Sequence, residues 1–400
     1  MVCSVRILKN VYGGDGLGRL GDGRVVFIAG AFEGELVKAD IFEERRGYVK
    51  ARLTEVVEPS PARLGEGPVP APGMVYANIS RDGELKLKAA QLAEFFSRAR
   101  IEANVPSKCE YAGSGANYRN KVVYHIATSK PPHIGYMHEP EHKVVDVTTD
   151  PLAVKQINEQ LAFVRSRVLA LLTQGAKAVR ESTRQKGTLT MRYSKISGVK
   201  WWLGEAPKDV VIKEMTCGKI FQVPADGFWQ VNCEAGEALV KVVRDEYLRG
   251  AGECPDIVDL YCGVGVFGIV CKAALKRECW LAGVESGRAA TEFARTNADA
   301  NGVKGRFWAG ETGRLLRRLR ITPRTTVILD PPRGGLEQGV AKYLAASHAG
   351  RIFYVSCDPA TLMRDLKTIT RSFEVESVKW FDMFPRTARF ETLVILKKKK

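Results

Sequence analysis

Short runs of alternating apolar and polar residues fill the first part of the chain. Residues 24–28 and 35–41 are two such runs, and glycine-rich turns at 13–16 and 21–23 separate them from their neighbours. Alternation with period two is typical of strands that bury one face, and turns at this spacing join antiparallel strands. The pattern predicts a small β-barrel over residues 1–59.

A stretch rich in proline and glycine, residues 60–73, reads as a linker. Beyond it, residues 87–103 and 151–173 have the periodicity of helices, whereas 121–127 and 187–196 are typical of strands. This mixture predicts an α+β middle domain over residues 74–208 and leaves its topology open.

From residue 209 onward the pattern changes to short apolar strands separated by helices. The expected strands are 257–261, 280–285, 326–330, 351–356 and 391–396. Strands that alternate with helices predict a parallel, doubly wound, Rossmann-like sheet, here over residues 209–400. Ligands of such sheets bind at the carboxyl ends of the strands.

Composition narrows the class of partner. The 400 residues hold 61 lysines and arginines against 45 acidic residues, a surplus of 16 that favours a polyanion such as nucleic acid. Two basic groups are candidate RNA contacts, although such clusters are often only solvated faces: Arg180, Arg184 and Lys186, and Arg314, Arg317, Arg318 and Arg320. Since the chain has no run of eighteen apolar residues and no signal-peptide pattern, we expect a cytoplasmic protein without a membrane span.

A glycine turn follows the expected strand 257–261. Gly263, Gly265 and Gly268 fit G-x-G-x-x-G, and Glu285 ends the next strand, where an acid that binds ribose belongs. Dinucleotides and S-adenosylmethionine both need close backbone approach and such an acid. The motif therefore predicts a nucleotide-like ligand and leaves its identity open.

Cys357 distinguishes between these ligands. It follows an expected strand, and Asp358 and Pro359 have the residue types of a helix N-cap and first helical position. A thiolate that adds to carbon 6 of uracil makes carbon 5 able to accept a methyl group, chemistry that a dehydrogenase does not need. The alternative is a small buried residue, the usual fate of a free cysteine.

Such a reaction also needs a base that removes the proton from carbon 5. Glu391, at the start of the last expected strand, is the candidate, and a surface glutamate is the equally open alternative on position alone.

Together these segments resemble the bacterial uracil-C5 RNA methyltransferase family. The barrel resembles a TRAM domain, residues 118–121 are similar to a segment of the family's middle region, and residues 228–232 are similar to the segment that opens its catalytic domain. The resemblance implies S-adenosylmethionine as cofactor and RNA as partner, with Cys357 as nucleophile and Glu391 as proton acceptor. Implied cofactor contacts are Gln230, Tyr261, Glu285 and Asp330. The glycine turn adds Gly263 and Gly265, and Glu311, which replaces another polar neighbour of the cofactor in the family, is a further candidate. By analogy we favour 23S ribosomal RNA over transfer RNA, and we expect a monomer.

The chain departs from the family at several positions. Many members carry four cysteines that hold an iron–sulfur cluster, whereas here only Cys109 lies near the first three and Thr149–Asp150–Pro151 stands in place of the fourth. We therefore expect no cluster and no metal. Val266 replaces an asparagine after the glycine turn, and Arg386 and Arg389 replace two histidines, which suggests a phosphate contact.

Four other functions remain open. A cytosine-C5 methyltransferase carries a second cysteine where this chain has Arg333, and an amino-group methyltransferase carries an aromatic residue there. A non-catalytic RNA-binding protein would have no chemical reason to keep both Cys357 and Glu391. A nicotinamide dehydrogenase is the most distant alternative.

Overall fold

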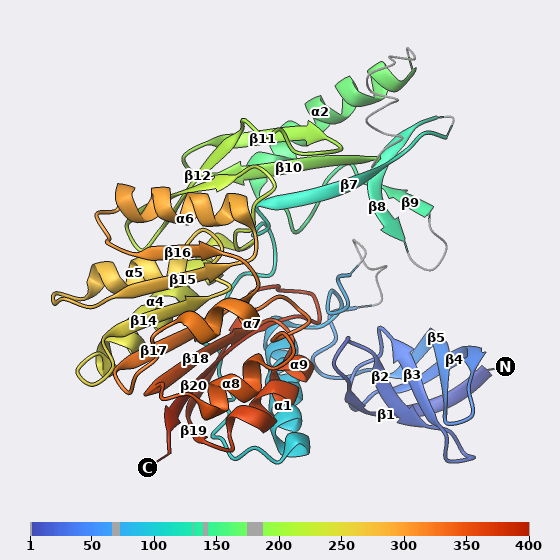
Figure 1. Ribbon diagram of the computed structural model, residues 1–400. Helices are drawn as coiled ribbons and strands as arrows, with labels where there is room; N and C mark the ends of the chain where they lie inside the picture. The colour runs from blue at the N-terminus through green and yellow to red at the C-terminus, as the bar shows by residue number, and fades with distance from the viewer. Residues whose placement is uncertain (1, 66–72, 130, 139–142, 174–186, 400) are drawn as a thin grey trace.

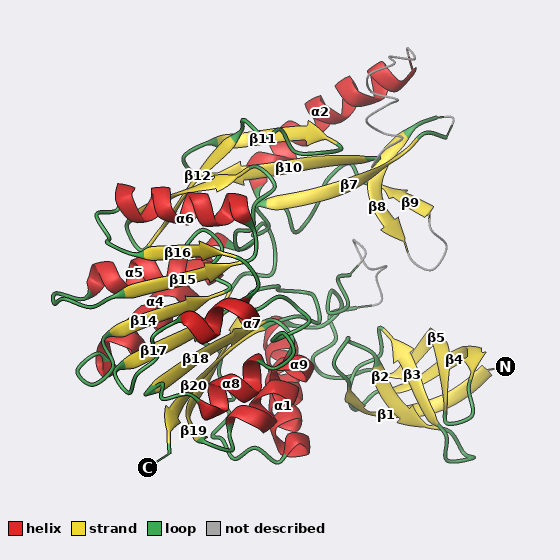
Figure 2. Cartoon of the chain, in the orientation of Figure 1, coloured by secondary structure: helices red, strands yellow, loops and turns green. Residues whose placement is uncertain are grey.

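The computed structural model describes residues 2–65, 73–129, 131–138, 143–173 and 187–399. They form a barrel, a five-stranded sheet with a long helix, and an eight-stranded sheet with helices on both faces. Figure 1 shows these parts in chain order and Figure 2 by secondary structure. The predicted fold class is confirmed. Among the described residues, no helix has both the length and the apolar character to cross a membrane.

The N-terminal strands close into a barrel in the order β1-β2-β3-β5-β4. Their bounds are β1 (Val2–Asn10), β2 (Gly16–Arg19), β3 (Val25–Ala29), β4 (Leu36–Glu44) and β5 (Tyr48–Glu58). Alternate residues such as Val5, Ile7 and Val26 fill the interior. A Cβ atom at Gly18 would lie 2.2 Å from Cγ1 of Val5. Strand β2 can therefore lie this close to the Val5 side chain of β1 only because position 18 is glycine.

The middle of the chain forms a sheet in the order β11-β10-β7-β8-β9. Its elements are β7 (Lys121–Ala127), β8 (His133–His138), β9 (Lys143–Asp146), α2 (Lys155–Thr173), β10 (Thr188–Ser194) and β11 (Gly198–Leu203). Ile157, Leu161, Val164 and Val168 of α2 recur at helical spacing and pack on the sheet. The helix and strands expected here are confirmed.

Helix α1 (Arg81–Ala99) falls within the range expected for the middle domain but packs elsewhere. Leu92 and Phe96 belong to the core of the eight-stranded sheet. The helix begins six residues before the expected start because the side chain of Ser80 accepts a hydrogen bond from the backbone N–H of Gly83. Strand β6 (Tyr111–Ala112) likewise joins the edge of the eight-stranded sheet.

That sheet has the order β16-β15-β14-β17-β18-β20-β19-β6. Its remaining strands are β14 (Asp256–Leu260), β15 (Leu281–Glu285), β16 (Arg306–Ala309), β17 (Thr325–Leu329), β18 (Arg351–Ser356), β19 (Phe373–Asp382) and β20 (Glu391–Lys398). Strands β14 to β18 are parallel, as predicted. The prediction of a wholly parallel sheet is wrong, because β20 runs antiparallel to both β18 and β19.

A second correction concerns the start of this region. Strands β12 (Val211–Thr216) and β13 (Lys219–Pro224) form a separate antiparallel hairpin. The two-residue turn between them contains Cys217 and Gly218, both with positive φ, which is the geometry of a tight hairpin turn. Alternation of strand and helix begins only after this hairpin.

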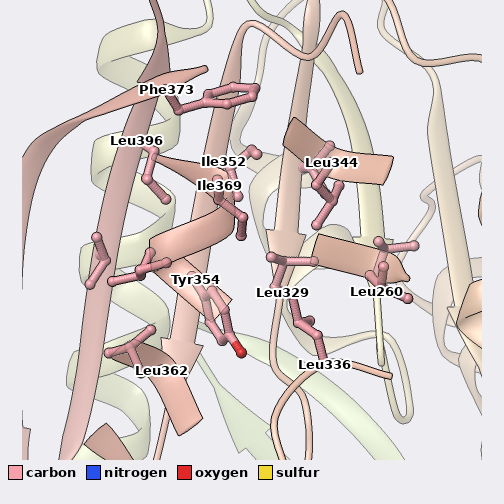
Figure 3. Packing of buried hydrophobic residues seen from close by; sticks show 14 of the residues in the cluster. Leu260, Leu329, Leu336, Leu344, Ile352, Tyr354, Leu362, Ile369, Phe373 and Leu396 are labelled. Atoms are coloured by element: carbon pink, nitrogen blue, oxygen red, sulfur yellow. The ribbon is translucent and has the colours of Figure 1, made fainter. Parts of the chain in front are cut away.

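Helices cover both faces of the eight-stranded sheet. One face carries α4 (Cys233–Gly250), α5 (Val266–Ala274) and α6 (Arg288–Ala300). The other carries α1, α8 (Val340–Ala346) and α9 (Pro359–Ile369), with the short α7 (Thr312–Leu315) and the 3-10 helix η1 (Leu316–Arg318). Figure 3 shows the interlocking side chains of this second face, among them Leu329, Ile352 and Leu362.

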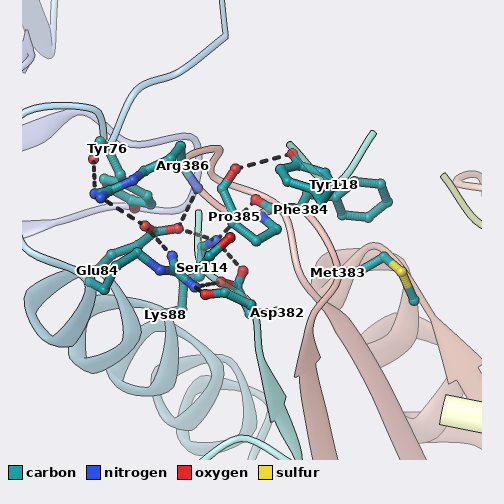
Figure 4. A network of polar contacts seen from close by, with 12 residues as sticks. Tyr76, Glu84, Lys88, Ser114, Tyr118, Asp382, Met383, Phe384, Pro385 and Arg386 are labelled. Atoms are coloured by element: carbon teal, nitrogen blue, oxygen red, sulfur yellow. Dashed lines mark hydrogen bonds and ion pairs between the residues drawn. The ribbon is translucent and has the colours of Figure 1, made fainter. Parts of the chain in front are cut away.

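A buried ionic network ties α1 to the end of β19 (Figure 4). Lys88 Nζ donates to Glu84 Oε1 at 2.7 Å and to Asp382 Oδ1 at 2.6 Å, and Arg81 pairs with both carboxylates. The side chains of Lys88, Glu84 and Asp382 are wholly buried. The backbone N–H of Arg386 also donates to Glu84, at 2.7 Å. The network therefore holds the segment that leads into β20.

Removing Lys88 is expected to destabilise the fold, because among the described residues Asp382 would keep only Arg81 as an ion-pair partner, and Glu84 only Arg81 and the more distant Arg386. We predict that Lys88→Ala lowers the free energy of unfolding by about 3–5 kcal/mol. Lys86→Ala, an exposed lysine on the same helix, should change it by less than about 0.5 kcal/mol. Urea denaturation of the two variants measures this, and equal midpoints would contradict the role given to the network.

Candidate active site

Tyr261 and Asp330 lie side by side at the carboxyl edge of the sheet. Leu260 of β14 pairs with Leu329 of β17, so the next residue of each strand stands at the same level. The backbone of Tyr261 is in the left-handed region, with φ of 62°. Such backbone strain in a residue other than glycine clusters at functional sites. It turns the chain sharply out of β14 toward the glycine turn.

Cys357 and Glu391 meet at the same edge. Ser356 of β18 pairs with Thr392 of antiparallel β20, so Cys357 and Glu391 stand opposite each other just beyond that pair. A parallel β20, as the sequence predicted, would place Glu391 at the far edge of the sheet. The antiparallel strand therefore brings the expected nucleophile and base together.

One pocket gathers several of the residues predicted to bind a cofactor. Gln230, Tyr261, Gly263 and Asp330 line it, together with apolar side chains that include Phe228, Trp229, Val264 and Phe267. A Cβ atom at Gly263 would point into open space, although its φ of 54° disfavours other residues. Apolar walls with a few placed polar groups are typical of small-molecule sites.

Glu285 and Gly265 fix the glycine turn that lines this pocket. One oxygen of Glu285 accepts from the backbone N–H of Gly263 at 3.1 Å and the other from that of Gly287 at 2.7 Å. Gly265 is the N-cap of α5, with φ of 88°. Glu311 is not brought to the pocket: its side chain is 61% exposed and pairs with Arg314 at 2.8 Å. A contact from Glu311 to the cofactor thus has no support from this geometry.

At the carboxyl edge of the sheet, the surroundings favour the protonated forms of Cys357, Asp330 and Glu391. Burial, together with the carboxyl groups of Glu391 and Asp330, raises the pKa of Cys357 to about 12. Burial raises the pKa of Asp330 to about 7. Burial and Asp330 raise the pKa of Glu391 well above its usual value, and Arg333 partly opposes this.

The predicted helix cap beside Cys357 is confirmed. Asp358 Oδ1 accepts from the backbone N–H groups of Ala360 and Thr361 at the start of α9. The helix dipole favours a thiolate, but at Cys357 desolvation and the nearby carboxyl groups outweigh it. In the ligand-free protein, Cys357 is therefore a protonated thiol.

Tyr12 of the barrel reaches this edge, which the sequence did not reveal. Its hydroxyl accepts from Arg389 Nη1 at 2.9 Å and donates to the backbone carbonyl of Cys357 at 3.4 Å. Arg389 also pairs with Asp358 Oδ2 at 3.0 Å. The Tyr12 ring packs edge-on against Phe390, next to Glu391. A tyrosine in a glycine-rich turn carries no pattern that would have predicted this contact.

The two arginines that replace family histidines differ in their surroundings. The Arg386 guanidinium donates to the carbonyls of Tyr76 and Ile79, at 3.2 and 2.6 Å, and is largely buried. It is thus occupied within the fold, which argues against the suggested phosphate contact there. Arg389 is 38% exposed and keeps access to a neighbouring cavity.

That cavity, of about 550 Å³, opens between the three parts of the chain. Its basic lining residues are Arg119, Lys121, Arg333 and Arg389, and apolar ones include Val231, Leu152 and Phe384. Of the basic groups expected from the sequence, Arg180, Arg184 and Lys186 lie outside the described residues. The cavity joins cationic groups to the edge where Cys357 lies, as an anionic substrate requires.

All nine cysteines are free thiols. In the part of the chain that the structure describes, no three histidine, cysteine or acidic side chains gather to form a metal site. Asp150, where the family has a cysteine, instead accepts hydrogen bonds from the hydroxyls of Tyr124 and Tyr136. Its residue type is a poor ligand for iron–sulfur clusters.

Comparison with known proteins gives three matches to family models. Residues 2–54 match the TRAM domain, 234–337 the methyltransferase small domain, and 313–399 the tRNA (uracil-5-)-methyltransferase model. The last of these includes Asp330, Cys357 and Glu391.

Similar proteins span the whole chain. An uncharacterized RNA methyltransferase of Thermotoga maritima is 27% identical, over 100% of this chain and 99% of that protein. A tRNA (uracil(54)-C(5))-methyltransferase of Schizosaccharomyces pombe is 27% identical, over 96% of this chain and 76% of that protein. The structure of Pyrococcus abyssi tRNA (uracil-54, C5)-methyltransferase with S-adenosyl-L-homocysteine has a TM-score of 0.72 and 22% identity, covering 98% of this chain and all of that one.

The raised pKa of Cys357 predicts slow alkylation that accelerates with pH. Because the thiol predominates far below pH 12, its thiolate fraction rises about tenfold per pH unit between pH 7 and 9. Alkylation of Cys357 by iodoacetamide, followed by peptide mass spectrometry, should rise in the same proportion. A plateau near pH 8 would contradict the raised pKa.

Proposed function

Since the chain belongs to the family of TRAM-containing uracil-C5 RNA methyltransferases, we propose that it forms 5-methyluridine in RNA from S-adenosylmethionine, with Cys357 as nucleophile and Glu391 as base. The observation that carries the assignment of roles is the antiparallel pairing of β18 with β20, which sets these two residues opposite each other.

The pocket beside this edge fits S-adenosylmethionine. When bound, this cofactor supplies a methyl group on a positively charged sulfonium. The Asp330 carboxyl lines the pocket, and among the described residues no ion pair involves it. A carboxyl group without a counter-charge favours a cationic ligand. Glu285 is suited to accept from ribose hydroxyls, and Gln230 and Tyr261 to contact the adenosine or the target base.

The residues of the chain account for each bond change at the uracil. Cys357 Sγ adds to carbon 6, and the electron pair of the 5,6 double bond moves to carbon 5, which acquires the methyl group. The bound cofactor would supply this methyl group, and its sulfur would keep the electron pair of the broken bond. Glu391 then takes the proton from carbon 5, the bond between Sγ and carbon 6 breaks, and the double bond returns.

This sequence requires protons to move before addition. In the ligand-free protein both Cys357 and Glu391 favour their protonated forms, because burial disfavours their anions. Arg333 lowers both pKa values. We infer that the positive charge of the bound ligand, added to that of Arg333, shifts both groups toward their anions when the site fills.

The target base must leave its stack to reach Cys357, so we propose a flipped nucleotide in a loop or single strand. The cavity lined by Arg119, Lys121, Arg333 and Arg389 supports this, because its cations lie where the flanking phosphates would enter.

As to the RNA, 23S ribosomal RNA is the substrate predicted from the sequence by analogy. The named relative from Schizosaccharomyces pombe supports transfer RNA as a second candidate.

Incubation with labelled S-adenosylmethionine tests the reaction and its substrate together. Wild-type protein with unmodified ribosomal RNA or transfer RNA should give 5-methyluridine, detected by nucleoside mass spectrometry, in one of the two. Cys357→Ala should abolish it, since no other group supplies the thiolate. Cys3→Ala, a cysteine of the barrel, is the matched control and should retain activity.

Glu391→Gln separates the two catalytic roles. If Glu391 only removes the proton, the variant should still add and methylate but fail to release, leaving protein covalently attached to RNA on a denaturing gel. Absence of both label and adduct with the wild-type protein on either RNA would refute the proposed function. A variant that turns over normally would reassign the base.

Tyr12→Phe tests the link from the barrel. Loss of one hydroxyl removes hydrogen bonds to Arg389 and to the Cys357 carbonyl but keeps the packing against Phe390. We predict a fall in kcat of about threefold to tenfold with little change in KM for RNA.

Tyr48→Phe, the same change elsewhere on the barrel, should leave kcat unchanged. If Tyr12→Phe instead raised KM alone, Tyr12 would act on RNA binding rather than on the position of Cys357.

A further inference from the structure

A hollow of about 690 Å³ lies beside the outer strand of the eight-stranded sheet, away from the active site. Strand β16 is the edge strand of the sheet, and in Figure 1 it lies at the end farthest from β19. Trp280, which precedes β15, and Trp308 of β16 line the hollow. The hollow extends from Arg306 at the amino end of β16 to Trp308, which pairs with Val284 near the carboxyl end of β15, whereas Cys357 follows β18, four strands away.

The hollow exists because one face of the sheet is incompletely covered there. The core on this face is packed by α1, α8 and α9, but over β15 and β16 only α7 and η1 are present, with four and three residues. Trp280 and Trp308 pack against that core yet remain partly exposed. Two half-exposed indoles leave apolar ring surface at the protein exterior.

Cations surround these indoles. Lys304, Arg306, Arg318 and Arg320 line the hollow and are exposed. None of the four side chains has a hydrogen-bond or ion-pair partner among the described residues. Glu278 is the one acidic residue that the hollow's described lining contains. Arg314, by contrast, is paired with Glu311 and stands outside it.

We propose that this hollow is a second RNA-binding site, which holds a single-stranded segment outside the loop that enters the active site. Unpaired cations neutralise phosphates, and indole rings accept stacked bases of any sequence. An acidic protein segment would use the cations but has no use for the indoles. The proposal extends the proposed function, since it takes RNA as the substrate.

The position of the hollow predicts which RNA it contacts. Strand β16 lies four strands away from β18 in the sheet, and neighbouring strands are about 4.8 Å apart, so the hollow and Cys357 are separated sideways by roughly 19 Å. One flipped nucleotide cannot reach both. The hollow therefore increases affinity for long RNA and leaves the chemical step alone.

The test compares two double variants that remove equal charge. Arg318→Ala/Arg320→Ala removes two cations of the hollow. Arg288→Ala/Arg249→Ala removes two arginines, 89% and 69% exposed, from helices on the opposite face. The dissociation constant for a single-stranded RNA of roughly 30 mixed nucleotides is measured by fluorescence anisotropy at several salt concentrations.

We expect the Arg318→Ala/Arg320→Ala variant, the hollow pair, to bind the RNA more weakly. Its affinity should also depend less on salt concentration. The slope of log affinity against log salt should fall in magnitude by about 1.4–1.8, since each phosphate contact contributes about 0.7–0.9. The control pair should keep the wild-type slope. Equal slopes for the two pairs would overturn the proposal, because bulk charge would then explain the binding.

Two further measurements address stacking and the class of partner. Trp308→Ala should weaken RNA binding about tenfold and Trp308→Phe much less, because base stacking on an aromatic ring is of that size. Polyglutamate should compete poorly with the RNA; competition as strong as that of unlabelled RNA would assign the hollow to an acidic protein instead.

Formation of 5-methyluridine by the wild type is scored separately. If methylation is absent while the hollow pair still weakens RNA binding, the proposed function fails and the hollow remains an RNA site. If methylation is present and both pairs bind alike, only the hollow fails.

Discussion

The antiparallel insertion of β20 between β18 and β19 is the constraint on which the active site depends. In a wholly parallel sheet every strand would begin at the edge away from the ligand. Because β20 runs the other way, its first residue, Glu391, lies at the edge where β18 ends and where Cys357 follows. One reversed strand thus places the proposed nucleophile and the proposed base at the same edge of the sheet.

The segment between β19 and β20 must reverse the direction of the chain at the carboxyl edge of the sheet. A buried ionic network holds this segment in place. Glu84 accepts from Lys88 and from the backbone of Arg386, and Asp382 ends β19 within the same network. Buried ion pairs seldom add much net stability, but a missing partner is costly. The network therefore acts chiefly to specify one path for the segment before Glu391, and α1 belongs to the catalytic unit for that reason.

The sequence predicted the features that local patterns encode. The strand before Gly263, the cap formed by Asp358 and the strand that ends at Ser356 all depend on neighbouring residues, and the structure has each of them. Cys357 lies where the sequence placed it, between a strand end and a helix cap, and its role as nucleophile stays a prediction.

The features that the sequence did not predict depend on contacts between distant segments. The direction of β20 is set by its neighbours in the sheet rather than by its composition, and the packing of α1 depends on core residues that lie between 258 and 396 in the sequence. Tyr12 shows no pattern at all, because its role is defined by Arg389 and the Cys357 carbonyl across the fold. Glu311, expected as a cofactor neighbour in place of another polar residue of the family, has an exposed side chain that pairs with Arg314, and its role stays a prediction.

These observations suggest how the parts of the chain divide the work on RNA. The carboxyl edge of the sheet is shared: the sheet supplies Cys357 and Glu391, and the barrel supplies Tyr12, so the barrel is a structural component of the active site as well as an RNA-binding module. A hydroxyl that holds the nucleophile's backbone from another domain makes the geometry of Cys357 sensitive to how the barrel is seated. Under the proposed function, RNA bound to the barrel would reach Cys357 only through its backbone carbonyl, by way of the Tyr12 hydroxyl.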